Sequence, residues 1–301
     1  MGELLRGAKL TILPHPLSEN RDWQFWTEVV FVSICHQATW DRLHNRIIRV
    51  VSEDPSIIHP SKLAIISPAD FDRLFAPGFD SERLRQVERL RILRKMGEQV
   101  QMWPSVDPSE CFTKGLIHLE GSNGLYSWLD RFSVYAEDPL RKKARVLVHQ
   151  LLHYGLIEVD DPQHIRAAVD YHIIRLYART NRVMPAVPKA GGPLENGEEP
   201  HVKLLTHLRR AVEEAMAYTA AGAMIRIDEL NHIEWQIARS FCTRKEARCH
   251  CGPLPEKPVD NIVALLSQAR GGRCPYVDDC PAVSDTKLRL LVDPKSSKAF
   301  Y

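Results

Sequence analysis

Apolar side chains recur every three or four positions through several segments of this sequence, which is the spacing of one face of an α-helix. In SERLRQVERLRILRKMG, residues 81–97, the apolar positions are Leu84, Val87, Leu90, Leu93 and Met96. Gly97 is expected to end this helix. The same spacing predicts helices over 25–50, 139–154, 163–179, 201–216 and 228–242. No segment requires a strand by alternation, so the sequence predicts an all-α, or mostly α, fold.

Two segments rich in proline and glycine interrupt these helices and are expected to form loops. They are PAVPKAGGPLENGEEP, residues 185–200, and the stretch 252–273, which contains GPLPEKP. The 301 residues are enough for one large domain or two small ones. With 44% hydrophobic and 26% charged residues, the chain is expected to fold around a core.

The composition also limits the partners and the cell compartment. The net charge of +2 is too small to indicate a nucleic-acid partner by itself. No segment approaches the roughly 18–20 apolar residues of a membrane helix, and the opening MGELLRGAKL lacks the apolar stretch of a secretory signal. We therefore expect a cytoplasmic protein with no membrane partner, in which cysteines stay reduced.

Basic residues are concentrated between positions 83 and 95. They are Arg83, Arg85, Arg89, Arg91, Arg94 and Lys95, opposed by Glu82 and Glu88. Two interpretations are open for this basic stripe. A helix face exposed to solvent is the usual meaning of a charge run, and we favour it over a surface that lies along phosphates.

Five of the seven cysteines fall within residues 242–280. The spacing is Cys-x6-Cys-x-Cys in FCTRKEARCHC, residues 241–251, and Cys-x5-Cys in CPYVDDC, residues 274–280. Thiolates so close in sequence can converge on one soft metal centre, either tetrahedral zinc or an iron–sulfur cluster. Such a centre takes four ligands, so with His250 also present the segment offers more candidates than one centre needs.

Asp170 stands at a position typical of a helix start. In IRAAVDYHIIRLYART, residues 165–180, it follows an apolar triplet and precedes a run with helical spacing. Its carboxylate is therefore expected to cap that helix. His172, two positions further on, is expected to be a buried histidine with satisfied hydrogen bonds.

AVDYHIIRLYART and ARSFCTRKEARC together resemble the helix-hairpin-helix/Gly-Pro-Asp superfamily of DNA glycosylases, in particular its endonuclease III-like members. In that superfamily an apolar-Val-Asp-x-His motif presents the catalytic aspartate. The resemblance implies that Asp170 is the catalytic residue of this chain. An ionised carboxylate suits this role because breaking an N-glycosidic bond builds positive charge on the sugar.

The cysteines carry the second half of the resemblance. In the superfamily a Cys-x6-Cys-x2-Cys-x5-Cys loop near the C-terminus binds a [4Fe–4S] cluster, and here the first and last pairs match while the connector is longer. The resemblance implies a [4Fe–4S] cluster, with zinc as the alternative. Its ligands are drawn from Cys242, Cys249, Cys251, Cys274 and Cys280.

Two further stretches resemble the superfamily. DPLRKKARVLVHQLL, residues 138–152, resembles the helix start that carries a nucleophilic lysine, which would be Lys142. The alternative role for Lys142, and the expected role for Arg141 and Lys143, is to contact DNA phosphates. If the lysine is no nucleophile, water activated by Asp170 leaves a glycosylase without lyase activity.

SICHQATW, residues 33–40, resembles the element that fills the duplex where the base has left. Gln37 is therefore expected to contact DNA, and His36 to hydrogen-bond a base edge. Aromatic rings stack on extruded bases, and Trp40 and Tyr171 are the rings that we expect at the site. Trp23, Trp26 and Trp103 are further candidates, most of which belong to a core.

The resemblance also implies an organisation. A single glycosylase-like unit would span 1–301 in two helical lobes. A hairpin-like lobe with the catalytic aspartate would cover about 110–185, and a second lobe would join 25–105 to 200–242. The metal loop would be 242–282. The hairpin is atypical, because YAEDP stands in place of a glycine-rich turn, as in archaeal 8-oxoguanine and phage-defence glycosylases.

We therefore expect a monomeric DNA N-glycosylase that flips out and excises a modified base, leaving an abasic site. The base would be a bulky modified cytosine of phage DNA, in antiviral defence, or an oxidised purine. One alternative is a nucleoside or nucleotide N-glycosidase for deazaguanine salvage. An alternative of another class is a module that binds modified DNA without catalysis.

Overall fold

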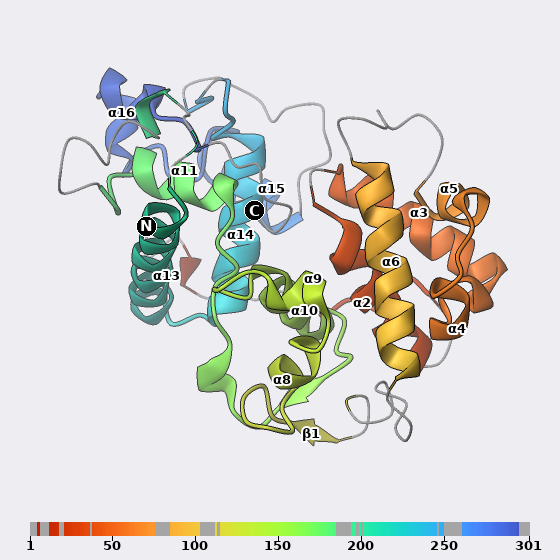
Figure 1. The fold of residues 1–301 in the computed structure, drawn as a ribbon. Helices are drawn as coiled ribbons and strands as arrows, with labels where there is room; N and C mark the ends of the chain where they lie inside the picture. Colours follow the sequence, from red (N-terminus) through yellow and green to blue (C-terminus); the bar gives the residue numbers. More distant parts are fainter. Residues whose placement is uncertain are drawn as a thin grey trace. The chain divides into compact units, whose positions relative to one another are not determined.

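The structure is a computed structural model in which helices dominate, so the prediction of a mostly α fold is confirmed (Figure 1). It describes residues 5–6, 12–17, 21–36, 38–75, 85–102, 112, 115–184, 194–196, 199, 201–245, 247–249 and 261–294. Across these ranges no helix combines the length and the apolar character needed to cross a bilayer.

The chain divides into two compact units. We call Thr11–Ile165 the N-terminal unit, and Arg166–Ala299 together with Met1–Leu10 the C-terminal unit. This division differs from the lobes implied by the resemblance. The lobe expected over 110–185 is split between the units, because the helix that follows Asp170 packs against helices of the C-terminal unit.

The N-terminal unit is built around one buried helix. Its elements are α2 (Arg21–Ile34), α3 (Trp40–Glu53), η1 (Pro55–Ile58), α4 (Pro60–Leu63), α5 (Pro68–Phe75), α6 (Gln86–Gln101), β1 (Leu116–Ile117), α8 (Leu125–Leu129), α9 (Ser133–Ala136), α10 (Lys142–His153), β2 (Glu158–Val159) and η2 (Pro162–His164). All residues of α2 from Phe25 to Ile34 are buried, as expected of a helix that is apolar on most sides. Helices α3, α6 and α10 pack against it.

The helix expected over 25–50 is in fact two helices, because α2 ends at Ile34 and α3 begins at Trp40. Two buried cations bind the carbonyl groups at the end of α2. Lys143 Nζ donates to Ser33 O at 2.8 Å, and Arg89 Nε donates to Ile34 O at 2.9 Å. These long-range bonds satisfy carbonyls that a helix end leaves without partners. Periodicity alone does not reveal them.

The basic stripe is only partly a solvated face, so the interpretation that we favoured is incomplete. Arg89 is fully buried, donates to Ile34 O and His36 O, and has its guanidinium 4.9 Å from the centre of the Phe75 ring. Arg94 Nη2 donates to Ile66 O at 2.8 Å. Part of the basic stripe therefore holds α6 to the rest of the N-terminal unit.

Gly97 does not end a helix but lies inside α6. A Cβ atom at this position would lie 2.2 Å from Ala64 N and 2.5 Å from Pro60 O. The glycine therefore allows the backbones of α6 and α4 to touch. The expected helix end was wrong because close packing, and not helix termination, requires this glycine.

Strands β1 and β2 pair in parallel, with Leu116 opposite Glu158 and Ile117 opposite Val159. The sequence did not predict them, because two-residue strands are too short for a visible alternation. The helix expected over 163–179 is also shorter than predicted. Helix α11 begins only at Tyr171, after the short helix η2 and an irregular segment.

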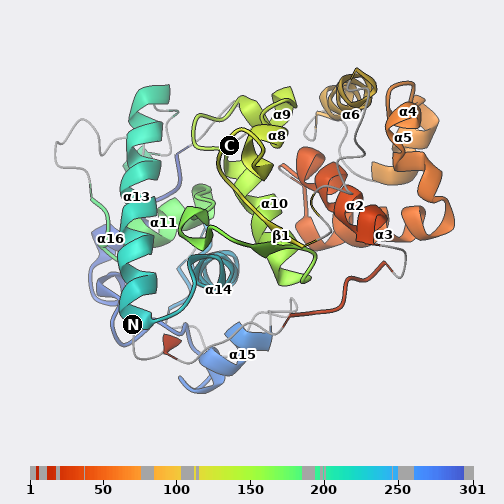
Figure 2. The same ribbon diagram turned by 90° about the horizontal axis from the view of Figure 1, so that it is seen from below.

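The C-terminal unit contains α11 (Tyr171–Arg179), α13 (Val202–Ala223), α14 (Ile227–Ser240), α15 (Asn261–Gln268), η3 (Pro281–Val283) and α16 (Thr286–Leu290). Helix α11 packs against α13, α14 and α16, and Figures 1 and 2 both show it beside α13 and α14. Helix α15 lies within 252–273, which the sequence predicted to be a loop.

Candidate functional site

Asp170 is the N-cap of α11, as predicted. Its backbone is extended, with φ −114° and ψ −177°, and its Oδ1 accepts a hydrogen bond from the Ile173 N–H at 3.0 Å. The preceding residues Ala167, Ala168 and Val169 are buried, whereas Asp170 is only partly buried. A carboxylate with some solvent access therefore stands at the start of this helix.

The second carboxylate oxygen is held by a residue that the sequence analysis missed. Trp235 Nε1 of α14 donates to Asp170 Oδ2 at 3.0 Å. The two residues are distant in sequence, and no local motif links them. Because each oxygen accepts one hydrogen bond from a different element, the orientation of the carboxylate is fixed.

The two residues after Asp170 form an aromatic pair. The rings of Tyr171 and His172 have their centres 4.2 Å apart, and His172 also meets the Trp235 ring edge-on at 6.2 Å. Burial and the charge of Asp170 raise the pKa of Tyr171 to about 12, and burial lowers the pKa of His172. Arg175 Nη2 donates to His172 Nδ1 at 2.9 Å. The expected hydrogen bonding of His172 is therefore found at Nδ1, but the residue is partly buried and not fully buried as expected.

Two arginines connect α11 to the first cysteine. Arg175 Nε donates to Cys242 O at 2.7 Å, and its guanidinium also forms a buried ion pair with Asp293. Arg179, one helical turn later, donates from Nη1 to Cys242 Sγ at 3.5 Å and to Thr243 O at 2.7 Å. The helix that Asp170 caps is therefore bonded directly to the start of the cysteine segment.

Four of the five candidate cysteines line one small cavity. They are Cys242, Cys249, Cys274 and Cys280. The first three are buried, Cys280 is partly buried, and all four are free thiols. The remaining lining residues are Leu176, Arg179, Thr180, Phe241, Ala247, Tyr276 and Ala282. Cys251 and His250 lie outside the described residues.

The cavity has features that bear on a metal centre. Within the described part of the chain, no three of the cysteine sulfurs lie mutually within 4.8 Å. Burial raises the pKa values of three of these thiols, that of Cys249 to about 11 and those of Cys274 and Cys280 in the same direction. A metal centre must therefore displace protons from these thiols. The guanidinium of Arg179 lies beside them and would offset part of the negative charge that results.

The candidate lysine begins α10 as expected. Arg141 is the N-cap residue of α10 and makes no side-chain cap hydrogen bond. The preceding Asp138 accepts from Leu140 N–H through Oδ1 at 3.0 Å and from Lys142 N–H, the first of the helix, through Oδ2 at 2.8 Å. Lys142 itself is partly buried. Because it belongs to the N-terminal unit and Asp170 to the C-terminal unit, the two candidates lie in different units.

The residues on either side of Lys142 differ in burial. Lys143 is 3% exposed and binds Ser33 O, and burial lowers its pKa to about 8. The expected phosphate contact at Lys143 is therefore corrected, because its side chain is buried. Arg141 is partly exposed and ion-paired with Asp130 at 2.6 Å and Glu120 at 3.3 Å, and its phosphate contact stays a prediction.

The segment expected to enter DNA is described only in part. Gln37 lies outside the described residues. His36 is 6% exposed, and neither ring nitrogen has a hydrogen-bond partner among the residues that the structure describes. Burial, with Lys143 and Arg89 nearby, lowers its pKa to about 2. The expected contact of His36 with a base edge is corrected, because both nitrogens are enclosed.

The described aromatic candidates are buried or partly buried. Trp40 is partly buried and meets the Phe31 ring edge-on at 4.4 Å. Trp26 is buried and donates to Ile58 O, so it belongs to the core. Trp103 lies outside the described residues. Tyr171 directly follows Asp170 in the chain.

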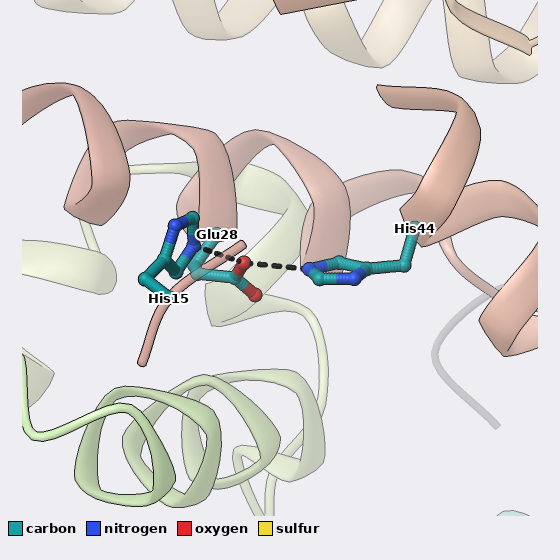
Figure 3. Close-up of side chains that lie close together, drawn as sticks. All are labelled: His15, Glu28 and His44. Carbon is teal, nitrogen blue, oxygen red and sulfur yellow. Dashed lines mark hydrogen bonds and ion pairs between the residues drawn. The ribbon is translucent and has the colours of Figure 1, made fainter. Parts of the chain in front are cut away.

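A second group of polar side chains, not predicted from the sequence, lies in the N-terminal unit (Figure 3). Glu28 of α2 is fully buried, and its Oε1 binds His15 Nε2 at 2.9 Å and His44 Nε2 at 2.7 Å. Burial raises the pKa of Glu28, but the two histidines outweigh this effect, and the net direction is downward.

Two histidines and a carboxylate are a common metal-ligand set, but the hydrogen bonds argue against a metal here. The Leu17 N–H donates to His15 Nδ1 at 3.1 Å, so Nδ1 carries a lone pair and Nε2 carries the proton. A ligating histidine has the reverse arrangement, with its other ring N–H donating outward. The group therefore acts as a hydrogen-bonded link from residues 12–17 to α2 and α3.

Comparison with known proteins found no protein-family model that matches this chain and no similar sequence among curated proteins.

Proposed function

We propose that this chain is a DNA N-glycosylase that excises a modified nucleobase, with Asp170 as its catalytic residue. The observation that carries the proposal is a partly exposed carboxylate at a helix start, fixed by Ile173 N–H on one oxygen and Trp235 Nε1–H on the other. The resemblance of AVDYHIIRLYART to the glycosylase motif supports the same residue.

The proposed reaction is hydrolysis of the bond between the sugar C1′ and the base nitrogen. The base departs with the bonding electrons and takes up a proton, while the oxygen of water forms the new bond to C1′. Positive charge builds on the sugar before that bond is complete, as in glycoside hydrolysis. Asp170 would stabilise this charge and accept a proton from the attacking water. Each of its oxygens retains a lone pair beyond its present hydrogen bond.

Lys142 is proposed as the residue that would add a lyase step. Its neutral amine would attack C1′ in place of water, and the base would leave with the bonding electrons and take up a proton. Opening of the sugar ring, in which O4′ takes the proton that the amine loses, would give a Schiff base between Lys142 and C1′. Borohydride reduces that Schiff base, and elimination of the 3′ phosphate from it is the lyase step. Lys143 is the lysine with the lowered pKa, but its Nζ is buried against Ser33 O. Trapping of the adduct with borohydride tests the role of Lys142. Trapping lost in Lys142→Gln and retained in Lys143→Gln supports it, and the reverse result transfers the role to Lys143.

We assign a structural [4Fe–4S] cluster to the four described cysteines, with Cys251 as a substitute ligand. Zinc–sulfur bonds of about 2.3 Å bring four thiolates to roughly 3.8 Å from one another. A [4Fe–4S] cluster takes one thiolate on each of its four irons, and the four cysteines of the cavity would supply these ligands. When bound, the cluster would supply a cross-link between the segments around residues 242–249 and 274–280. Iron, sulfide and zinc analysis of protein purified without oxygen distinguishes the two metals.

The decisive experiment measures the release of bases by Asp170→Asn. Asparagine caps helices as well as aspartate, so α11 should remain folded while the charge is lost. The matched control is Asp285→Asn, because Asp285 caps α16 in the same unit and accepts from Lys287 N–H at 2.8 Å. Parent and Asp285→Asn should release a base, and Asp170→Asn should be slower by at least about a hundredfold.

Mass spectrometry of the products identifies the substrate. The panel contains phage DNA with bulky modified cytosines, DNA with oxidised purines, and free deazaguanine nucleosides. Release from DNA alone supports the glycosylase, and release from nucleosides alone supports the salvage enzyme. If parent protein releases no base from any of them but binds modified DNA, the protein is a binding module and Asp170 is only a helix cap.

A further inference from the structure

We infer that Trp235 and Arg239 of α14 form a positioning device for the Asp170 carboxylate. The inference deepens the proposed function and rests on it for its kinetic consequence. Its structural basis does not depend on that function, because it consists of two contacts among side chains of the C-terminal unit. Arg239 contacts the Trp235 ring, and Trp235 donates to Asp170.

The first contact is the hydrogen bond from Trp235 Nε1 to Asp170 Oδ2 at 3.0 Å. An indole N–H can only donate, so it cannot change role with the state of its partner. A hydrogen bond to an ionised acceptor is stronger than one between two neutral groups. The bond is also the one contact described here that reaches Asp170 from outside its own helix turn.

The second contact is made to the face of the indole ring. The Arg239 guanidinium carbon is 4.5 Å from the centre of the Trp235 ring, within the range of a cation–π interaction. Residues four apart on a helix lie on the same face, so α14 itself holds this pair together. A cation over the ring draws electron density from the indole, which makes its N–H a stronger donor toward Asp170.

Each of the two donors holds one oxygen of the Asp170 carboxylate. The Ile173 N–H fixes Oδ1, and the helix cap by itself would leave rotation about the Cβ–Cγ bond loosely restrained. Trp235 fixes Oδ2 and removes that freedom. With both bonds made, the free lone pairs point in defined directions, which matters for a group that must face a sugar carbon.

The kinetic test uses Trp235→Phe, which keeps an aromatic ring for Arg239 and His172 and removes only the N–H donor and one ring's volume. The expected result is a loss of about 10- to 100-fold in kcat with KM for DNA unchanged, as for removal of one charge-assisted hydrogen bond. Arg239→Gln should show a smaller loss of the same kind, and Arg239→Lys should recover part of it. A change in KM alone would mean that Trp235 contacts DNA and would overturn the inference.

The second measurement does not depend on activity. The chain has six tryptophans, and the indole N–H resonance of Trp235 is identified by its disappearance in Trp235→Phe. In Asp170→Asn this resonance should move upfield, because a neutral amide oxygen is a weaker acceptor, while the other indole resonances stay in place. Arg239→Gln should move it in the same direction by less.

The two measurements separate the inference from the function. An indole resonance that responds to Asp170→Asn in a protein that releases no base supports the positioning device and contradicts the glycosylase. Base release that depends on Asp170, with an unmoved indole resonance and an unchanged kcat in Trp235→Phe, supports the glycosylase and overturns the device.

Discussion

Arg179 joins the helix that Asp170 caps to the first cysteine, donating from Nη1 to Cys242 Sγ at 3.5 Å. The contact comes from the last turn of α11, whose first turn is capped by Asp170. Helix α14 makes a second connection, because it carries Trp235 and ends immediately before Phe241 and Cys242. The candidate catalytic residue and the cysteine cavity therefore share two helices.

Loss of the metal centre proposed at the cysteines should make the helices that hold Asp170 more mobile. If the proposed cluster is bound, Cys274→Ala should abolish its visible absorbance. The same change should increase amide hydrogen exchange in α11 and at the end of α14, because both helices terminate at the cavity. Cys35→Ala, in the other unit, should change neither. Unaltered exchange over 171–179 in Cys274→Ala would contradict the connection.

Arg175→Met should destabilise the C-terminal unit by about 3 kcal/mol, measured as the free energy of unfolding in urea. The substitution leaves Asp293 buried without its closest cation, and such a loss costs more than the intact pair contributes. Arg244 remains 3.4 Å from the other oxygen of Asp293 and is half exposed, so Arg244→Met should cost less than about 1 kcal/mol. An equal loss of unfolding free energy in the two variants would contradict the prediction that the buried ion pair of Asp293 contributes more than the partly exposed one.

Gly97→Ala should destabilise the N-terminal unit by about 2 kcal/mol or more, because the added methyl would lie 2.2 Å from the Ala64 backbone. The matched control is Gly222→Ala in α13, where a Cβ would meet no atom within 4 Å. That change should be neutral or stabilise by up to about 1 kcal/mol. A stabilising effect at position 97 would contradict the close contact of α4 and α6.

The stability of the N-terminal unit should respond to the titration of Lys143. Burial lowers its folded pKa to about 8 from the usual 10.5, so the unfolded chain holds this proton more tightly. The parent should therefore gain stability relative to Lys143→Met as the pH rises from 8 to 10.5, by about 3 kcal/mol in total, and the difference should be constant below pH 8. Lys142→Met is the control, and an equal pH dependence there would contradict the assignment to Lys143.

The helices were largely predictable because their signals are local. The apolar spacing in residues 86–101 and 202–223 predicted that these segments are helical. It predicted the buried face of α6 only in part, because Leu93 and Met96 are buried whereas Val87 is exposed and Arg89 is buried. Gly97 and the break after Ile34 were not predictable, since the first depends on the approach of α4 and the second on Lys143 and Arg89 from other helices.

The candidate site likewise has features that the sequence predicts and features that only the tertiary structure decides. The sequence by itself determined a mostly helical chain, the capping aspartate at position 170 and the group of cysteines, because each depends on residue types at short separations. The tertiary structure decided that Trp235 holds the second oxygen of Asp170, that Lys143 and His36 are buried, and that Glu28 binds two histidines. These contacts join residues far apart in the chain, and packing brings them together without leaving a local pattern.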